Sequence, residues 1–226
     1  MASFIKILTS ALTPQRNHQA IWKQCDFQRR FLLGLVLLFL SCIVNFYAGT
    51  YATREASGSV TDIVLSNTRV YDVDVLFVYG AFFLIIFIGA LCFARPRRFP
   101  FILLSLSVFV FTRSIFISLT HIGPFPEHVA LDLGTVTSKF IFGGDLFFSG
   151  HTGIPFLMGL LFWRERVLSY IFFSWSIFFG VIVLLGHLHY SIDVLSAFFI
   201  TYSIYHIASY FFPKEKQMFE NTLEKT

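Results

Sequence analysis

The chain alternates between long apolar runs and shorter polar segments, a pattern typical of proteins whose helices cross a membrane. A helix needs about 20 apolar residues to span the hydrocarbon core of a bilayer. Six stretches approach this length with almost no charged residue. They are residues 31–53, 75–94, 99–120, 146–163, 167–192 and 194–213. The pattern predicts an all-α integral membrane protein with six transmembrane helices.

No internal repeat or second soluble unit interrupts this pattern. We expect an N-terminal segment over residues 1–30, a six-helix membrane domain over 31–212 with the chemistry in 113–194, and a tail over 213–226. The first segment lacks a continuous apolar core, so no cleavable signal peptide is predicted. The first span would itself direct membrane insertion.

Composition supports the same class. Hydrophobic residues make up 56% of the chain and charged residues 13%, whereas a soluble domain has about 25% charged residues. These values argue against a soluble enzyme, a disordered chain or a nucleic-acid-binding protein. The three cysteines form no pair motif, so we expect neither a disulfide framework nor a zinc cluster, but packing in the core or against lipid.

The placement of basic residues predicts the orientation. Lys and Arg gather in the N-terminal segment, after the second and fourth spans, and in the tail, whereas the segments 54–74 and 121–145 are acidic on balance. Basic segments normally stay in the cytoplasm. We therefore expect both termini in the cytoplasm and the two acidic loops on the opposite side.

Arg113 breaks the apolar pattern of the third span. A charged side chain near the middle of a bilayer costs about 2.5–3.5 kcal/mol on insertion scales. By helical rise, Arg113 would lie about 10 Å below the outer end of its span. Its side chain could extend to the lipid headgroups or face inward to bind an anion, and the sequence leaves both open.

A second break is Ser149-Gly150-His151-Thr152, at the start of the fourth span. Ser149 is a favoured N-cap type, and Gly150 lets a ligand approach the backbone. A helix that begins here would direct free N–H groups at its outer end, an arrangement that binds anions. The alternative is an ordinary turn with an interfacial histidine.

A third break runs from His187 to Asp193. On a helix His189 and Asp193 would share one face, which His187 would not. An aspartate bound to one imidazole nitrogen fixes the tautomer and leaves the other nitrogen free to attack. The alternatives are a structural hydrogen bond at a helix start, or a zinc site with His151. Zinc is less favoured because no metal-binding spacing accompanies these residues.

Under the charge-based topology, four of these residues lie near the outer ends of their spans: Arg113, His151, His189 and Asp193. Arginine binds phosphate oxygens as a planar fork. One imidazole can attack phosphorus while the other protonates the leaving oxygen. Because the sequence has no Gly-rich nucleotide loop, the expected substrate is a phospholipid at the level of the headgroups.

The motifs GGDLFFSGHT (143–152) and HLHYSIDV (187–194) resemble those of the type 2 phosphatidic acid phosphatase superfamily, and within it the sphingomyelin synthase-like branch. The His-x-x-x-Asp spacing and the six-helix plan also fit. The broad phosphatase pattern has a Lys-x6-Arg-Pro segment and a Ser-Arg pair before the nucleophilic histidine. This sequence has neither, which favours the synthase-like branch.

The resemblance implies a lipid headgroup phosphotransferase. A phosphocholine-like group would pass from a glycerophospholipid donor to a lipid alcohol acceptor, such as ceramide or diacylglycerol, through a phosphohistidine. The resemblance implies His189, oriented by Asp193, as the nucleophile and His151 as the acid and base. The phosphate-binding residues would be Arg113, Ser149, Gly150 and Thr152. No metal and no cofactor is expected.

Two other functions stay open at this point. A lipid phosphatase would use the same residues with water as the acceptor, and a non-catalytic lipid-binding or transport protein would keep only the scaffold. In each case the partners are membrane lipids, and the site is expected on the non-cytoplasmic face of a multi-pass protein. The sequence does not fix the headgroup, the host membrane or the oligomeric state.

Overall fold

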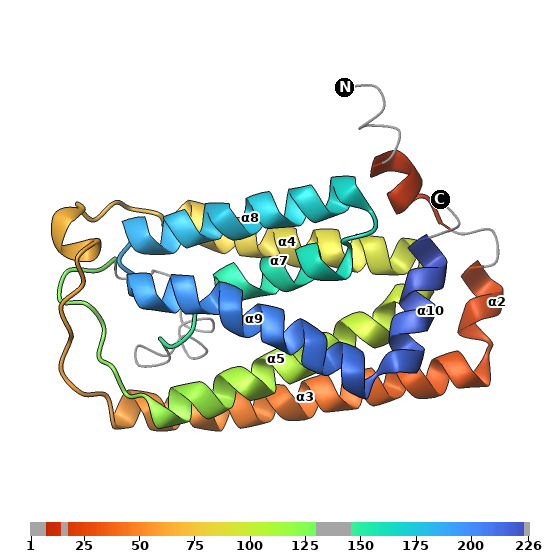
Figure 1. Ribbon diagram of the computed structural model, residues 1–226, viewed down its shortest axis with the longest axis horizontal. Coiled ribbons are helices and arrows are strands. Elements are labelled where there is room, and N and C mark those ends of the chain that lie inside the picture. Colours follow the sequence, from red (N-terminus) through yellow and green to blue (C-terminus); the bar gives the residue numbers. More distant parts are fainter. Residues whose placement is uncertain (1–7, 15–17, 130–145, 224–226) are drawn as a thin grey trace.

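The computed structural model describes residues 8–14, 18–129 and 146–223, whose long helices form a roughly aligned bundle, with shorter helices crossing one end (Figure 1). Within these ranges the chain contains helices and no strand. The helices, in chain order, are α2 (His18–Trp22), α3 (Cys25–Arg54), η1 (Leu65–Asn67), α4 (Asp74–Ala94), η2 (Pro96–Arg98), α5 (Phe99–Leu119), α7 (Gly150–Leu161), α8 (Arg166–Leu185), α9 (Ser191–Phe211) and α10 (Pro213–Leu223).

Five helical segments are long and apolar enough to cross a membrane: α3, α4, η2 with α5, α8 and α9. The fourth predicted span, over 146–163, is instead the 12-residue helix α7. At 1.5 Å per residue α7 is about 18 Å long, well short of the roughly 30 Å hydrocarbon core. Six spans are therefore not confirmed. The cause is local, because Ser149 caps the helix only at Gly150.

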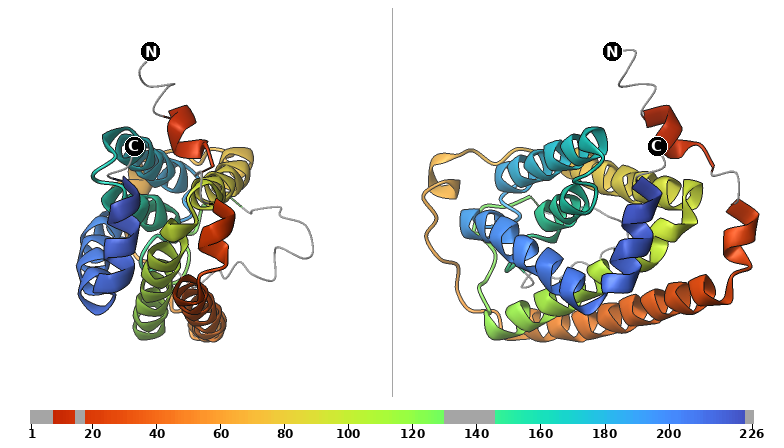
Figure 2. Two further views of the ribbon diagram at one scale, coloured as in Figure 1. Left: turned by 90° about the vertical axis from the view of Figure 1, so that its right-hand side faces the viewer. Right: turned by 45° about the vertical axis from the view of Figure 1, so that its right-hand side comes forward.

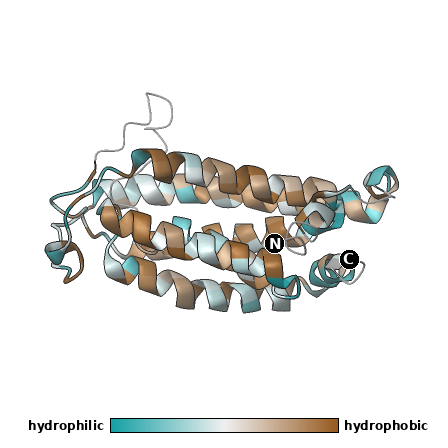
Figure 3. Cartoon of the chain, turned by 90° about the horizontal axis from the view of Figure 1, so that it is seen from above, coloured by the Kyte–Doolittle hydropathy of each residue, from teal (hydrophilic) through white to brown (hydrophobic). Residues whose placement is uncertain are grey.

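The outward faces of these helices carry large apolar side chains, and polar residues concentrate at the ends of the bundle (Figure 3). The exposed side chains include Phe39, Phe82, Phe93, Ile177 and Phe199. A soluble protein rarely exposes so much continuous apolar surface, so these helices indicate a multi-pass membrane protein. Of the three thiols, Cys92 is buried, as expected for a core residue, whereas Cys25 and Cys42 are exposed.

Aromatic side chains pack α4 against α8. The rings of Phe83 and Trp175 stack with their centroids 5.2 Å apart, and those of Phe87 and Phe172 lie 5.5 Å apart. At Gly80 the helices approach closely, because a Cβ there would lie 3.2 Å from the ring of Phe179. This contact holds the first two turns of α4 close to α8, and Phe77 in the first of them lies against His151.

The two ends of the bundle differ in character. Helices α2 and α10 lie together at one end, which we call the basic end, and segments 55–73, 120–129 and 186–190 lie at the other, which we call the loop end (Figures 1 and 2). The membrane side on which each end lies stays a prediction.

Arg98, at the basic end, makes buried contacts inside the bundle. It is fully buried, pairs with Glu165 and lies with its guanidinium carbon 5.1 Å from the centre of the Phe162 ring. A buried charge requires such a partner. The pair fixes η2 to the turn after α7 and so sets the position of α7 along the bundle.

Candidate active site

Helix α7 begins with a buried polar cap. The Ser149 hydroxyl oxygen accepts weak hydrogen bonds from the backbone N–H and the hydroxyl of Thr152, at 3.4 and 3.2 Å, and both side chains are fully buried. Ser176 on α8 donates to the Thr152 carbonyl oxygen at 2.7 Å. Both predicted phosphate-binding hydroxyls thus serve the start of α7, as in an ordinary N-cap.

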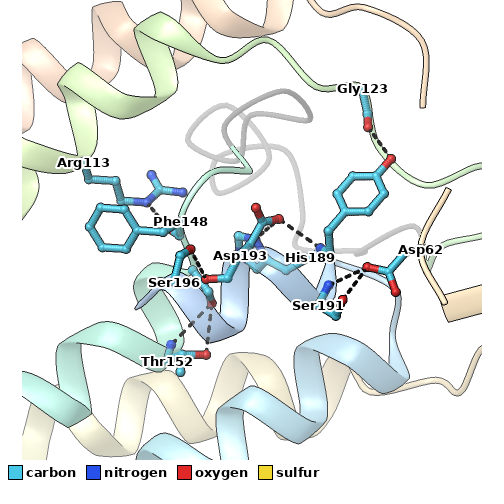
Figure 4. A network of polar contacts seen from close by, with 11 residues as sticks. Asp62, Arg113, Gly123, Phe148, Thr152, His189, Ser191, Asp193 and Ser196 are labelled. Carbon is cyan, nitrogen blue, oxygen red and sulfur yellow. Dashed lines mark hydrogen bonds and ion pairs between the residues drawn. The ribbon is translucent and has the colours of Figure 1, made fainter. Parts of the chain in front are cut away.

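Arg113 on α5 faces the start of α7 (Figure 4). Its Nε donates a hydrogen bond to the Phe148 carbonyl oxygen at 2.9 Å. A Cβ added to Gly150 would lie 3.6 Å from the same Nε, so the side chain rests directly against the first turn. This geometry favours the inward-facing interpretation of Arg113 over extension to the lipid headgroups.

His151, the second residue of α7, lies in an aromatic setting. Its ring centre is 4.2 Å from that of Phe77 on α4 and 5.7 Å from that of Phe179 on α8. The imidazole is thus held by aromatic rings from two helices.

His189 and Asp193 meet as predicted, although not across one helical face. Nδ1 of His189 lies 3.5 Å from Oδ2 of Asp193, but α9 begins only at Ser191, after His189. The reason is that Oδ2 also accepts the backbone N–H of Tyr190 at 2.9 Å, which caps the helix there. At this separation the two atoms are close enough for an ion pair but form no hydrogen bond.

Asp193 is fully buried, and its Oδ1 has no hydrogen-bond partner among the residues that the structure describes. A buried carboxylate is costly unless cationic or donor groups stabilise it. Oδ2 thus lies beside the His189 imidazole, whereas Oδ1 meets no donor in the described part of the chain.

A backbone hydrogen bond joins the two histidine motifs. The N–H of Ser149 donates to the carbonyl oxygen of Asp193 at 3.1 Å. This contact sets the start of α7 against the first turn of α9 and brings together segments far apart in the sequence.

The site is recessed within the bundle. Thr152 Cγ2 lies 3.8 Å from the position of a Cβ on Gly180. Gly180 precedes Leu185, the last residue of α8, by five positions, which corresponds to about 7.5 Å of helix. The start of α7 therefore lies below the loop end. If that end is at a membrane surface, this depth corresponds to the boundary between the lipid headgroups and the acyl chains.

Asp62, in the acidic segment 54–74, binds the start of α9 (Figure 4). Its Oδ2 accepts the backbone N–H and the hydroxyl of Ser191, at 2.7 and 2.8 Å. Burial disfavours its charge, but the hydrogen bonds from Ser191, Leu65 and Val64 prevail and lower the pKa of Asp62 below its usual 3.8. Only the tertiary structure reveals this contact.

Tyr190 and His187 attach a second loop to the same turn. The Tyr190 hydroxyl donates to the Gly123 carbonyl oxygen, and Nδ1 of His187 lies 2.7 Å from the Glu127 carbonyl oxygen. His187 is buried and has a left-handed backbone with φ 52°, a rare conformation outside glycine. Its ring faces the loop 120–129, where it also lies 5.2 Å from the ring of Phe125.

Residues 143–145 of the first motif lie outside the described part of the chain. Among the residues described, no group of three or more His, Cys, Asp or Glu side chains is arranged to hold a metal ion. The zinc interpretation of His151, His189 and Asp193 therefore gains no support from the geometry.

Residues 143–210 match the family described as PAP2 superfamily C-terminal. No curated protein and no solved structure matches the chain significantly. The matched segment contains both histidine motifs, helices α7 and α8, and α9 except for its last residue. It supports the PAP2 superfamily and, with it, an enzyme of the phosphatase or phosphotransferase type, but it does not distinguish the sphingomyelin synthase-like branch.

Proposed function

We propose that this chain, whose C-terminal part matches the PAP2 superfamily, transfers a phospho-headgroup from a glycerophospholipid to a lipid alcohol such as ceramide or diacylglycerol. The observation that carries the proposal is the hydrogen bond from Ser149 N–H to the Asp193 carbonyl oxygen. It places the segment with His151 beside the segment with His189.

In the first step, Nε2 of His189 attacks the phosphorus of the donor. A P–N bond forms, the P–O bond to diacylglycerol breaks, and protonated His151 gives its proton to the departing oxygen. The Asp193 carboxylate, 3.5 Å from Nδ1, stabilises the positive charge that develops on the imidazole. The product of this step is a headgroup phosphohistidine.

In the second step, neutral His151 takes the proton of the acceptor hydroxyl. The acceptor oxygen attacks phosphorus, the P–N bond breaks, and His189 returns to its starting state. Arg113 lies against the first turn of α7, so its charge and the free N–H groups of that turn would stabilise the non-bridging oxygens. Gly150 leaves this turn open to the phosphate.

Water in place of the lipid alcohol gives the second candidate, a lipid phosphatase. The match to the PAP2 superfamily favours both reactions equally. The recessed position of α7 supports the transferase, because a site below the loop end is more accessible to lipid alcohols than one at the surface. The proposed site would face the non-cytoplasmic side.

The test uses the purified protein in lipid nanodiscs that contain phosphatidylcholine labelled in its headgroup, with or without ceramide or a diacylglycerol whose acyl chains differ from those of the donor. A transferase produces a new headgroup-bearing lipid only with the acceptor, whereas release of a water-soluble headgroup phosphate without a new lipid contradicts the transferase. His189→Ala should lower turnover by about 10³-fold or more. A lipid-binding protein would instead keep its affinity and show no turnover.

The matched control is His206→Ala. His206 lies on the same helix as the site, but it is exposed, and its ring centre lies 4.6 Å from that of Tyr202. Its removal should leave turnover within about twofold of the unmodified protein, as is usual for surface substitutions.

A further inference from the structure

The carboxylate of Asp62 connects a distant loop to the turn that carries His189. In addition to the two bonds from Ser191, its Oδ1 accepts the backbone N–H groups of Val64 and Leu65, at 2.8 and 3.1 Å. The side chain is buried. One carboxylate therefore accepts four hydrogen bonds, two from its own loop and two from the start of α9.

Two carboxylates hold the backbone that directly follows His189. Asp193 accepts the N–H of Tyr190, and Asp62 accepts the N–H of Ser191. Both N–H groups belong to the start of a helix, where no backbone carbonyl is available to them. The path of residues 189–191 is thus fixed from inside α9 by one aspartate and from outside by the other.

We propose that Asp62 is a positioning residue for His189, acting through the backbone of Ser191. This inference rests on the proposed function, since it assigns Asp62 to the same reaction. Asp62 holds the His189 imidazole at the distance and direction that in-line attack on phosphorus requires. A displacement of about 1 Å in such a group lowers turnover by about 10²-fold.

Two substitutions remove the contact from opposite sides. Asp62→Ala removes the acceptor. Ser191→Pro removes both donors. Proline suits this position for two reasons: Ser191 is the first residue of α9, where proline is favoured, and the preceding Tyr190 has an extended backbone, with φ −71° and ψ 156°. The matched control is Asp72→Ala, because Asp72 is an exposed aspartate of the same segment and, among the described residues, accepts the N–H of Asp74 and none from α9.

The readouts are kcat and KM in nanodiscs, the thermal midpoint, and the affinity for orthovanadate, which mimics a phosphoryl group during in-line transfer. Asp62→Ala and Ser191→Pro should each lower kcat by about 10–100-fold with KM within about threefold, and each should weaken vanadate binding by about tenfold. The double variant should lose no more than either single one, because both remove the same contact. Asp72→Ala should match the unmodified protein.

The proposal is overturned if Asp62→Ala keeps kcat and vanadate affinity within twofold, if only the thermal midpoint falls, or if the two losses add. Vanadate binding without turnover of any lipid would contradict the proposed function, while the comparison of vanadate affinities would still decide the role of Asp62. If the unmodified protein neither binds vanadate nor turns over lipid, both proposals are wrong.

Discussion

Replacing Asp193 by asparagine isolates the effect of its charge on the proposed nucleophile. The asparagine oxygen can take the place of Oδ2, where it would still accept the N–H of Tyr190 and face Nδ1 of His189. The helix cap is thus preserved, and what disappears is the negative charge beside the imidazole.

The separation gives the expected magnitude. Two unit charges 3.5 Å apart interact by about 5 kcal/mol at an effective dielectric constant near 20. The carboxylate spreads its charge over two oxygens, so the loss is smaller than this value. We expect kcat to fall by about 10²–10³-fold, which corresponds to about 3–4 kcal/mol of barrier.

Stability should change less than activity in Asp193→Asn. The new amide NH₂ takes the place of Oδ1, which is buried without a hydrogen-bond partner among the described residues. An unsatisfied buried donor costs about 1–3 kcal/mol, which should lower the thermal midpoint without unfolding the protein at working temperature.

The assay is single-turnover formation of the phosphohistidine, normalised to folded protein, with Asp72→Asn as a control for a change of charge alone. A rate for Asp193→Asn within tenfold of the unmodified protein would refute the reasoning. An equal loss in Asp72→Asn would attribute the effect to net charge instead of the local pair.

Four further predictions follow from the described geometry. Arg113→Lys loses the planar guanidinium and its Nε–H hydrogen bond to the Phe148 carbonyl oxygen, so kcat/KM for lipid should fall about 10²-fold in the nanodisc assay. An unchanged kcat/KM would exclude Arg113 from phosphate binding. Gly153→Ala places a Cβ 2.7 Å from an aromatic ring and should cost about 1–3 kcal/mol in thermal unfolding, whereas Gly89→Ala, with open space, should be neutral. Folding lowers the pKa of Asp62 from 3.8, so the ionised carboxylate stabilises the folded protein fully above pH 3.8, and this stabilisation is lost as the pH falls through the pKa of the folded state. The thermal midpoint of Asp62→Ala should therefore approach that of the unmodified protein in acid. A cysteine at exposed Gly58, with the two exposed native cysteines replaced, should react with an impermeant maleimide from the non-cytoplasmic side, and labelling from the cytoplasm would reverse the predicted topology.

The sequence predicts the long helices well because charge and hydropathy determine them directly. The second predicted span, 75–94, differs by one residue from α4, and the third, 99–120, by one residue from α5. The fifth prediction, 167–192, extends past the end of α8 at Leu185. Its apolar run hides the turn at Gly186 and His187, where a positive φ reverses the chain.

The site was partly predictable. Motif spacing identifies His189 and Asp193 as partners, and their side chains do approach. It could not show that the contact arises in a capped turn, because capping depends on where α9 begins. Asp62 could not be found, since its bonds to Ser191 cross 129 positions of sequence and no periodic pattern carries that information.

The bond between Ser149 N–H and the Asp193 carbonyl oxygen involves only main-chain atoms. Almost every substitution at either position preserves it, and proline at 149 is the exception. The contact between the starts of α7 and α9 therefore tolerates side-chain substitution as long as the backbone path at residues 149 and 193 is kept. The turn that carries His189 has no such tolerance on its other side, because its contact with the loop 55–73 depends on the side chain of Asp62.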